Sequence, residues 1–151
     1  MYIYLYQNAY LLDFHTVESV RLFDVQNYRD LLIASIEFAK QKYDLGPVLY
    51  SIQSDRVKFL INSPNWFKFN LNFNTYTTMR LKQLLIRDKR LDFLDIFKHR
   101  YNNFGIWQPD RFPISIKNNI EFKREAKIFL GHQDMREEYT ILQTGLEDRS
   151  P

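Results

Sequence analysis

The sequence contains no cysteine, only four glycines and only three histidines among its 151 residues. Without cysteine, the chain has no disulfide framework, no thiolate ligand for zinc or an iron–sulfur cluster, and no thiol nucleophile. His15, His99 and His132 stand too far apart for a zinc-binding motif. So few glycines form no P-loop or Rossmann loop. We therefore expect neither a cofactor nor a bound metal.

Long apolar runs are missing as well. The longest candidate, residues 31–39, is interrupted by Ser35 and Glu37 and falls far short of the roughly 20 residues that cross a bilayer. The first twelve residues have neither the basic start nor the small-residue cleavage site of a signal peptide. These features predict a protein that is neither inserted in a membrane nor secreted. We expect it to work in the reducing compartment where it is made, the cytoplasm or the interior of an organelle.

Aromatic residues, by contrast, are abundant, with 13 Phe, 10 Tyr and 2 Trp. Hydrophobic residues make up 45% of the chain and charged residues 26%, which is the composition of a globular protein. Aromatic side chains dominate both cores and interfaces, so some of them are expected to face a partner. Codon bias in an AT-rich genome, such as that of an organelle, a virus or a low-GC bacterium, explains the same excess. Composition alone does not choose between the two explanations.

Hydrophobic patterning predicts one α+β domain over residues 1–131, followed by a polar, acidic and mobile tail at 132–151. The expected sheet is mainly antiparallel and has about four strands, packed with two or three helices. Strands are expected at 1–6, at 48–53 and 56–61 as a hairpin, and at 66–73. The last range alternates strictly, with Phe67, Phe69, Leu71 and Phe73 on one side.

Helices are expected at 24–43, with Asp24 as the N-cap, and at 78–97, capped by Thr77 or Thr78. The charged run at 87–90 is expected to divide the second helix into two. Residues 114–116 provide strand material, and residues 119–130 are predicted to form a short helix or strand. The segment around Trp107, between Gly105 and Pro109, has no regular pattern.

Charge is unevenly distributed along the chain. Residues 1–78 hold seven basic and seven acidic residues, residues 79–127 hold twelve and six, and residues 128–151 hold two and five. A basic middle segment therefore precedes an acidic end. Basic side chains beside aromatic rings can contact phosphates and stack on bases. The candidate nucleic-acid-binding residues are Arg87, Lys89, Arg90, Lys98, Arg100 and Tyr101. The alternative is a solvated helix face, because Asp88, Asp92 and Asp95 are interspersed among them.

One short pattern has an enzyme-like spacing. Pro109-Asp110, followed after ten residues by Glu121-Phe122-Lys123, resembles the PD-(D/E)XK motif of the restriction-endonuclease-like nucleases. In that family the two acidic residues hold Mg²⁺, the lysine positions or activates the attacking water, and a hairpin places the carboxylates on adjacent strands. The resemblance implies catalytic roles for Asp110, Glu121 and Lys123. The alternative is a loop aspartate and a surface Glu–Lys pair near a helix start.

Trp66, Phe104, Trp107 and Phe112 are the candidate partner-binding residues, because tryptophan and other large rings are enriched at interface hot spots. Trp107 stands out because a large ring in an irregular segment must either be tucked under the domain or inserted into a partner. The leading hypothesis is a non-catalytic subunit that packs into a larger protein assembly. A nucleic-acid-binding component of a ribonucleoprotein is the second hypothesis, and a Mg²⁺-dependent nuclease is the third.

Overall fold

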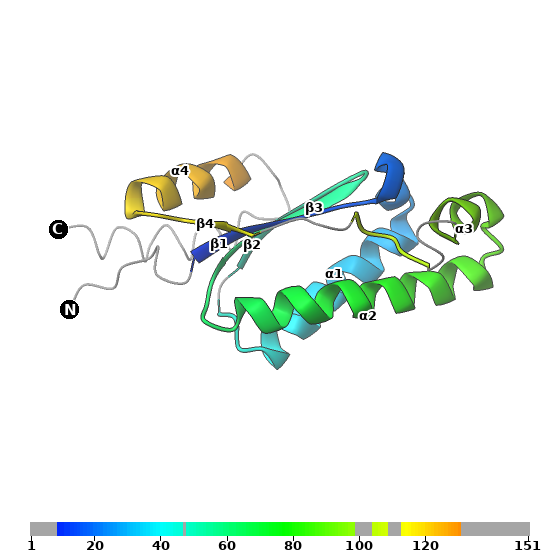
Figure 1. Cartoon of the computed structure of the whole chain (residues 1–151), viewed down its shortest axis with the longest axis horizontal. Coiled ribbons are helices and arrows are strands. Elements are labelled where there is room, and N and C mark those ends of the chain that lie inside the picture. Colours follow the sequence, from blue (N-terminus) through cyan, green and yellow to red (C-terminus); the bar gives the residue numbers. More distant parts are fainter. Residues whose placement is uncertain (1–8, 47, 99–103, 109–112, 131–151) are drawn as a thin grey trace.

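The computed structural model describes residues 9–46, 48–98, 104–108 and 113–130 (Figure 1). The predicted strand at 1–6 and the tail at 132–151 lie outside these ranges. The elements in chain order are β1 (Ala9–His15), the 3-10 turns η1 (Val17–Ser19) and η2 (Leu22–Asp24), α1 (Gln26–Lys42), β2 (Val48–Gln53), β3 (Arg56–Asn62), α2 (Trp66–Arg87), α3 (Leu91–Lys98), β4 (Ile114–Ser115) and α4 (Asn119–Leu130).

The four strands form one antiparallel sheet in the order β2-β3-β1-β4. Helices α1 and α2 lie on one face of this sheet, and α4 lies on the other (Figure 1). The α+β class and the antiparallel sheet are as predicted. The β2–β3 hairpin, helix α1 and the break between α2 and α3 also agree with the sequence prediction.

Strand β1 was not predicted, although it pairs with both β3 and β4. Its sequence does not alternate between apolar and polar residues, because both of its faces pack against apolar layers. Leu12 and Phe14 belong to the core beneath α1 and α2, whereas Ala9 and Leu11 pack in the smaller cluster beneath α4. A strand that is covered on both faces loses the period-two pattern by which sequence analysis finds strands.

The strand predicted at 66–73 is wrong, because these residues form the first two turns of α2. The buried positions of this helix recur every four residues: Phe69, Phe73, Thr77, Leu81 and Leu85. Phe69 and Phe73 satisfy both a strand pattern and a helix pattern, since their spacing of four is a multiple of two and also about one helical turn. The identity of the segment therefore depends on Phe67 and Leu71, which are exposed in the structure.

Two predicted helix caps are also corrected. Thr77 lies in the middle of α2, where its hydroxyl donates a 2.6 Å hydrogen bond to the carbonyl oxygen of Phe73. Helix α1 is preceded by Val25 as its N-cap, and Asp24 belongs to η2. The Asp24 carboxylate accepts hydrogen bonds from Arg21 and Ser54, and these bonds lower its pKa. Asp24 therefore ties η2 to the β2–β3 turn instead of capping α1.

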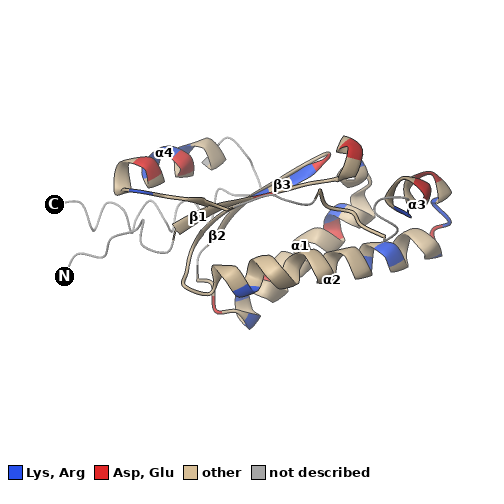
Figure 2. Ribbon diagram, viewed as in Figure 1, with Lys and Arg blue, Asp and Glu red and all other residues tan. Residues whose placement is uncertain are grey.

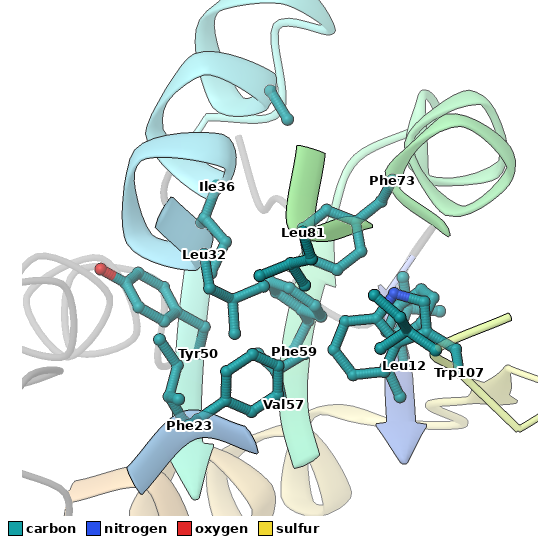
Figure 3. Packing of buried hydrophobic residues seen from close by; sticks show 14 of the residues in the cluster. Leu12, Phe23, Leu32, Ile36, Tyr50, Val57, Phe59, Phe73, Leu81 and Trp107 are labelled. Atoms are coloured by element: carbon teal, nitrogen blue, oxygen red, sulfur yellow. The ribbon is translucent and has the colours of Figure 1, made fainter. Parts of the chain in front are cut away.

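The main core lies between the sheet and the layer formed by α1 and α2 (Figure 3). Phe59 occupies the middle of β3 and is fully buried. Its ring makes edge-to-face contacts with Phe69 and Phe73 of α2, with centroid distances of 5.1 and 5.2 Å, and with Phe14 of β1 at 5.9 Å. Edge-to-face pairs of this kind contribute about 0.5–1.5 kcal/mol each beyond the burial of their area. Much of the aromatic content is thus used within the chain itself.

Tyr28 connects helix α1 to the turn that follows α2. The phenol is buried and donates a 2.9 Å hydrogen bond to Oδ2 of Asp88. Burial, followed by the hydrogen bond to the Asp88 carboxylate, raises the pKa of Tyr28 to about 12 from an ordinary value of 10.0. The same hydrogen bond, with the one from Arg87, holds the pKa of Asp88 below its usual 3.8.

This pKa difference predicts a loss of stability at high pH. Between about pH 10 and pH 12 the unfolded chain ionises Tyr28 while the folded chain does not, so the free energy of unfolding falls with rising pH by up to about 3 kcal/mol. The Tyr28→Phe variant should have lower stability at neutral pH and a shallower decline over that range. Urea titrations at successive pH values measure both effects. The surface variant Tyr76→Phe controls for the loss of one tyrosine, and equal slopes for wild type and Tyr28→Phe would contradict the prediction.

Candidate functional site

Helix α2 carries a second apolar stripe on the side opposite its buried one. Phe67, Leu71, Met79 and Ile86 are 55%, 56%, 50% and 56% exposed. Their spacings of four, eight and seven residues place them on one side of a helix. A surface helix that packs on a core normally presents polar residues on its outer side. The exposed stripe is therefore a candidate interaction surface.

The charge of α2 has a single sign. Lys68, Arg80, Lys82 and Arg87 lie on this helix, and the sequence has no acidic residue between Asp55 and Asp88. Figure 2 shows blue bands and no red along α2, whereas α1, α3 and α4 carry both colours. The charges that α2 itself places beside the apolar stripe are therefore all positive, which favours a partner that carries negative charge.

A groove of about 220 Å³ runs beside this stripe, between α1 and α2. Its walls include Phe38 of α1, which is 55% exposed, and Tyr76 and Met79 of α2. The rings of Phe38 and Tyr76 stack with centroids 6.1 Å apart. The ammonium of Lys42 lies 5.8 Å from the centroid of Phe38. We call the combined surface the α1/α2 outer face; it comprises Phe38, Lys42, Phe67, Leu71, Tyr76, Met79 and Ile86.

Trp107, the foremost predicted partner anchor, is placed differently by the structure. Its side chain is only 5% exposed, and its ring packs in the main core against Phe14, Phe23 and Phe73. The indole N–H donates a 2.8 Å hydrogen bond to the hydroxyl oxygen of Thr77. Trp107 is thus tucked under the domain, which is the first of the two placements that the sequence allowed.

The other predicted interface residues differ from one another. Trp66 is half-buried at the start of α2 and stacks on Tyr10 with centroids 4.0 Å apart. Phe104 is half-buried against Phe97, and the centroid of its ring lies 5.1 Å from the ammonium of Lys82. Phe112 lies outside the described residues. Of the described members, Trp66 adjoins the α1/α2 outer face, because its ring contacts that of Phe67 with centroids 5.6 Å apart.

The predicted nucleic-acid residues gather around the α2–α3 junction, where acidic partners neutralise two of them. Arg87 donates a hydrogen bond to Asp88, and Arg90 binds both carboxylate oxygens of Asp92, at 2.9 and 3.1 Å. The guanidinium of Arg90 holds the pKa of Asp92 below its usual value, so this carboxylate stays charged. Lys89 and Lys98 are exposed, while Arg100 and Tyr101 lie outside the described residues. In the described part of this cluster, positive and negative side chains alternate instead of forming a positive groove.

The residues of the nuclease-like pattern do not lie on strands in the described chain. Glu121 and Lys123 belong to the first turns of α4, and Asp110 lies outside the described residues. The amide of Glu121 donates to Oδ1 of Asn118 at 2.8 Å, and its carboxylate accepts from the amide of Lys117 at 3.3 Å. Asn118 thus caps the N-terminus of α4, and Glu121 reaches back to the residue before the cap. Glu121 therefore starts α4, and the strand placement that the resemblance implies is corrected.

The sequence did contain a signal for the α1/α2 outer face, but the strand interpretation of 66–73 concealed it. Read as a helix, the same residues show two apolar stripes on opposite sides, Phe69 with Phe73 and Phe67 with Leu71. The absence of acidic residues from 56 to 87 is visible in the sequence as well. The groove, however, requires the packing of α1 against α2 and is found only in the structure.

Among the described residues, no cluster of three or more His, Cys, Asp or Glu side chains is arranged to hold a metal ion. No helix in the described ranges is long and apolar enough to cross a membrane. Neither the models of known protein families nor the curated proteins give a match to this sequence.

Proposed function

We propose that this chain is a non-catalytic subunit of a larger protein assembly and that it docks through the α1/α2 outer face. The observation that carries the proposal is the exposed apolar stripe of α2. Four large apolar side chains, each at least half exposed, recur on one side of a helix whose opposite side is already buried in the core. Isolated apolar residues on a surface need no explanation, but a stripe continued by an aromatic groove does.

The geometry favours an amphipathic helix as the docked element. A groove between two helices, lined by Phe38, Tyr76 and Met79, suits a helix that inserts apolar side chains at four- and three-residue spacing. The flanking charges, Lys42, Lys68 and Lys82, favour acidic residues on the polar side of that helix. Aromatic side chains and methionine are enriched at the centres of such interfaces.

The proposal predicts that changes on the outer face release the chain from its assembly without unfolding it. The Leu71→Ser/Met79→Ser double variant removes two exposed side chains, so it should keep the thermal unfolding temperature of wild type within a few degrees. Its native particle, isolated gently from the source cells, should shrink from a large complex to the mass of the free chain. Size-exclusion chromatography with light scattering measures that mass.

A matched control uses apolar residues of similar or greater exposure on the other side of the molecule. Ile120 and Ile128 on α4 are 72% and 58% exposed, so the Ile120→Ser/Ile128→Ser variant should remain in the complex. Loss of the complex in both double variants, or in neither, would contradict docking through α1 and α2. Treatment of the wild-type particle with nuclease tests the second hypothesis. Collapse of the particle on that treatment would favour a ribonucleoprotein component instead.

A further inference from the structure

The sheet face beneath α4 is apolar at one end and polar beyond it. In the antiparallel register, Leu49, Leu60 and Leu11 form one row across β2, β3 and β1, and α4 packs on this row. The next row on the same face is Ser51, Lys58 and Asp13. A cavity of about 200 Å³ lies at this boundary, between the sheet, β4 and α4. It is separate from the α1/α2 outer face, which lies across the sheet (Figure 1).

The charged groups of this cavity do not satisfy one another. Asp13 and Lys58 are directly opposite in neighbouring strands, yet they form no ion pair. Oδ2 of Asp13 lies instead 2.8 Å from Nε2 of His15, although not in hydrogen-bonding geometry. Oδ1 of Asp13 is buried and has no hydrogen-bond partner among the described residues. A buried acceptor without a partner costs about 1–3 kcal/mol, so the described residues leave the Asp13 carboxylate incompletely satisfied.

The remaining walls divide into a polar and an apolar side. Ser51, Gln53 and Glu125 join Asp13 and Lys58 on the polar side. The apolar side is made by Leu11, Ile114, Ile128 and Phe129. A mostly apolar wall with a few convergent polar groups is the usual character of a small-molecule site. The volume suits a molecule of the size of one amino acid.

We propose that this cavity binds a small zwitterion with an apolar side chain, of the chemical class of a hydrophobic α-amino acid. The ligand's ammonium pairs with the carboxylate of Asp13, whose side chain is 33% exposed, its carboxylate pairs with Lys58, and its side chain packs against Ile114 and Ile128. A purely anionic ligand would bring its charge close to Asp13 and Glu125, whereas an amine without a carboxylate would leave Lys58 without a partner. Only a ligand that carries both charges can pair with both Asp13 and Lys58.

The test uses the full chain and three probes of one carbon skeleton. L-leucine carries both charges, isoamylamine carries only the ammonium, and 4-methylpentanoate carries only the carboxylate. Calorimetric titration and amide chemical shifts should show saturable leucine binding in the millimolar range or tighter, with shifts in β1, β3 and α4. Each single-charge analogue should bind about tenfold or more weakly, since it lacks one charge-assisted contact.

Two variants assign the charged contacts. Lys58→Met keeps the length of the side chain and should bind leucine and isoamylamine equally well, because the carboxylate no longer has a partner. Asp13→Asn should likewise bind leucine and 4-methylpentanoate equally well. Lys127→Met, at an exposed position of α4 that does not line the cavity, is the control and should bind leucine as wild type does. Absence of saturable leucine binding to the wild type, or a preference for leucine unchanged in Lys58→Met, would overturn the proposal. Binding and assembly are read separately, so either proposal can fail alone.

Discussion

Trp107→Ala is expected to lower the free energy of unfolding by about 3–5 kcal/mol, the usual cost of truncating a buried large ring. The indole is enclosed by three other aromatic rings, from β1, η2 and α2, at centroid distances of 5.6 to 6.2 Å. Its segment is also held by backbone hydrogen bonds, from Val17 to Ile106 and from Gln108 to His15. Alanine would leave a cavity at the point where α2, β1 and the 104–108 segment meet.

Part of that loss comes from the hydrogen bond to Thr77. Thr77→Val keeps the volume of the side chain but leaves the buried indole N–H without its acceptor, which should cost about 1–3 kcal/mol. Trp107→Phe also removes the donor, so Thr77→Val combined with Trp107→Phe should cost less than the two single changes added together. Urea unfolding followed by circular dichroism measures all four proteins.

The matched control for Trp107 is the other tryptophan. Trp66 is half-buried and contacts two rings, those of Tyr10 and Phe67, and Phe67 is itself 55% exposed, so Trp66→Ala should cost clearly less than Trp107→Ala. If Trp107→Ala left stability unchanged and only detached the chain from a partner, the ring would be an interface anchor after all. The core position described above would then be refuted.

The parts of the fold that were predictable are those whose pattern admits only one interpretation. Helix α1 repeats its buried positions at spacings of four, four and three, with Tyr28, Leu32, Ile36 and Ala39, and the step of three to Ala39 fits no strand. The β2–β3 hairpin consists of two short apolar runs around the turn at Ser54-Asp55. In both cases local sequence and tertiary packing favour the same structure.

The parts of the structure that the sequence did not predict share one physical cause. Whether a residue is buried depends on which other element of the fold covers its side of the strand, helix or loop. Strand β1 lies between two apolar layers, so its sequence AYLLDFH lacks alternation. The segment at 104–108 has no regular pattern, and the indole N–H of Trp107 donates to Thr77, which is 30 residues away in the sequence. The candidate ligand cavity depends on the register of three strands and on α4 above them. None of these relations is local in sequence.

The second large effect is predicted for the segment that the alternating pattern misassigned. Phe69→Ala should lower the free energy of unfolding by about 3–5 kcal/mol, whereas Leu71→Ala should change it by no more than about 0.5 kcal/mol. In α2, Phe69 is 1% exposed and packs against Phe59 and Phe73, while Leu71 is 56% exposed.

The stability losses of these two variants distinguish a helix from a strand at residues 66–73. If residues 66–73 were a strand with one buried face, Phe69 and Leu71 would lie side by side on that face, and both changes would be costly. In a helix, the two positions are 200° apart about the axis at 100° per residue, so only one of them reaches the core. Urea unfolding of both variants measures the difference. Equal and large losses would refute the helix, whereas a large loss for Phe69→Ala alone fits α2 and leaves Leu71 available on the outer face.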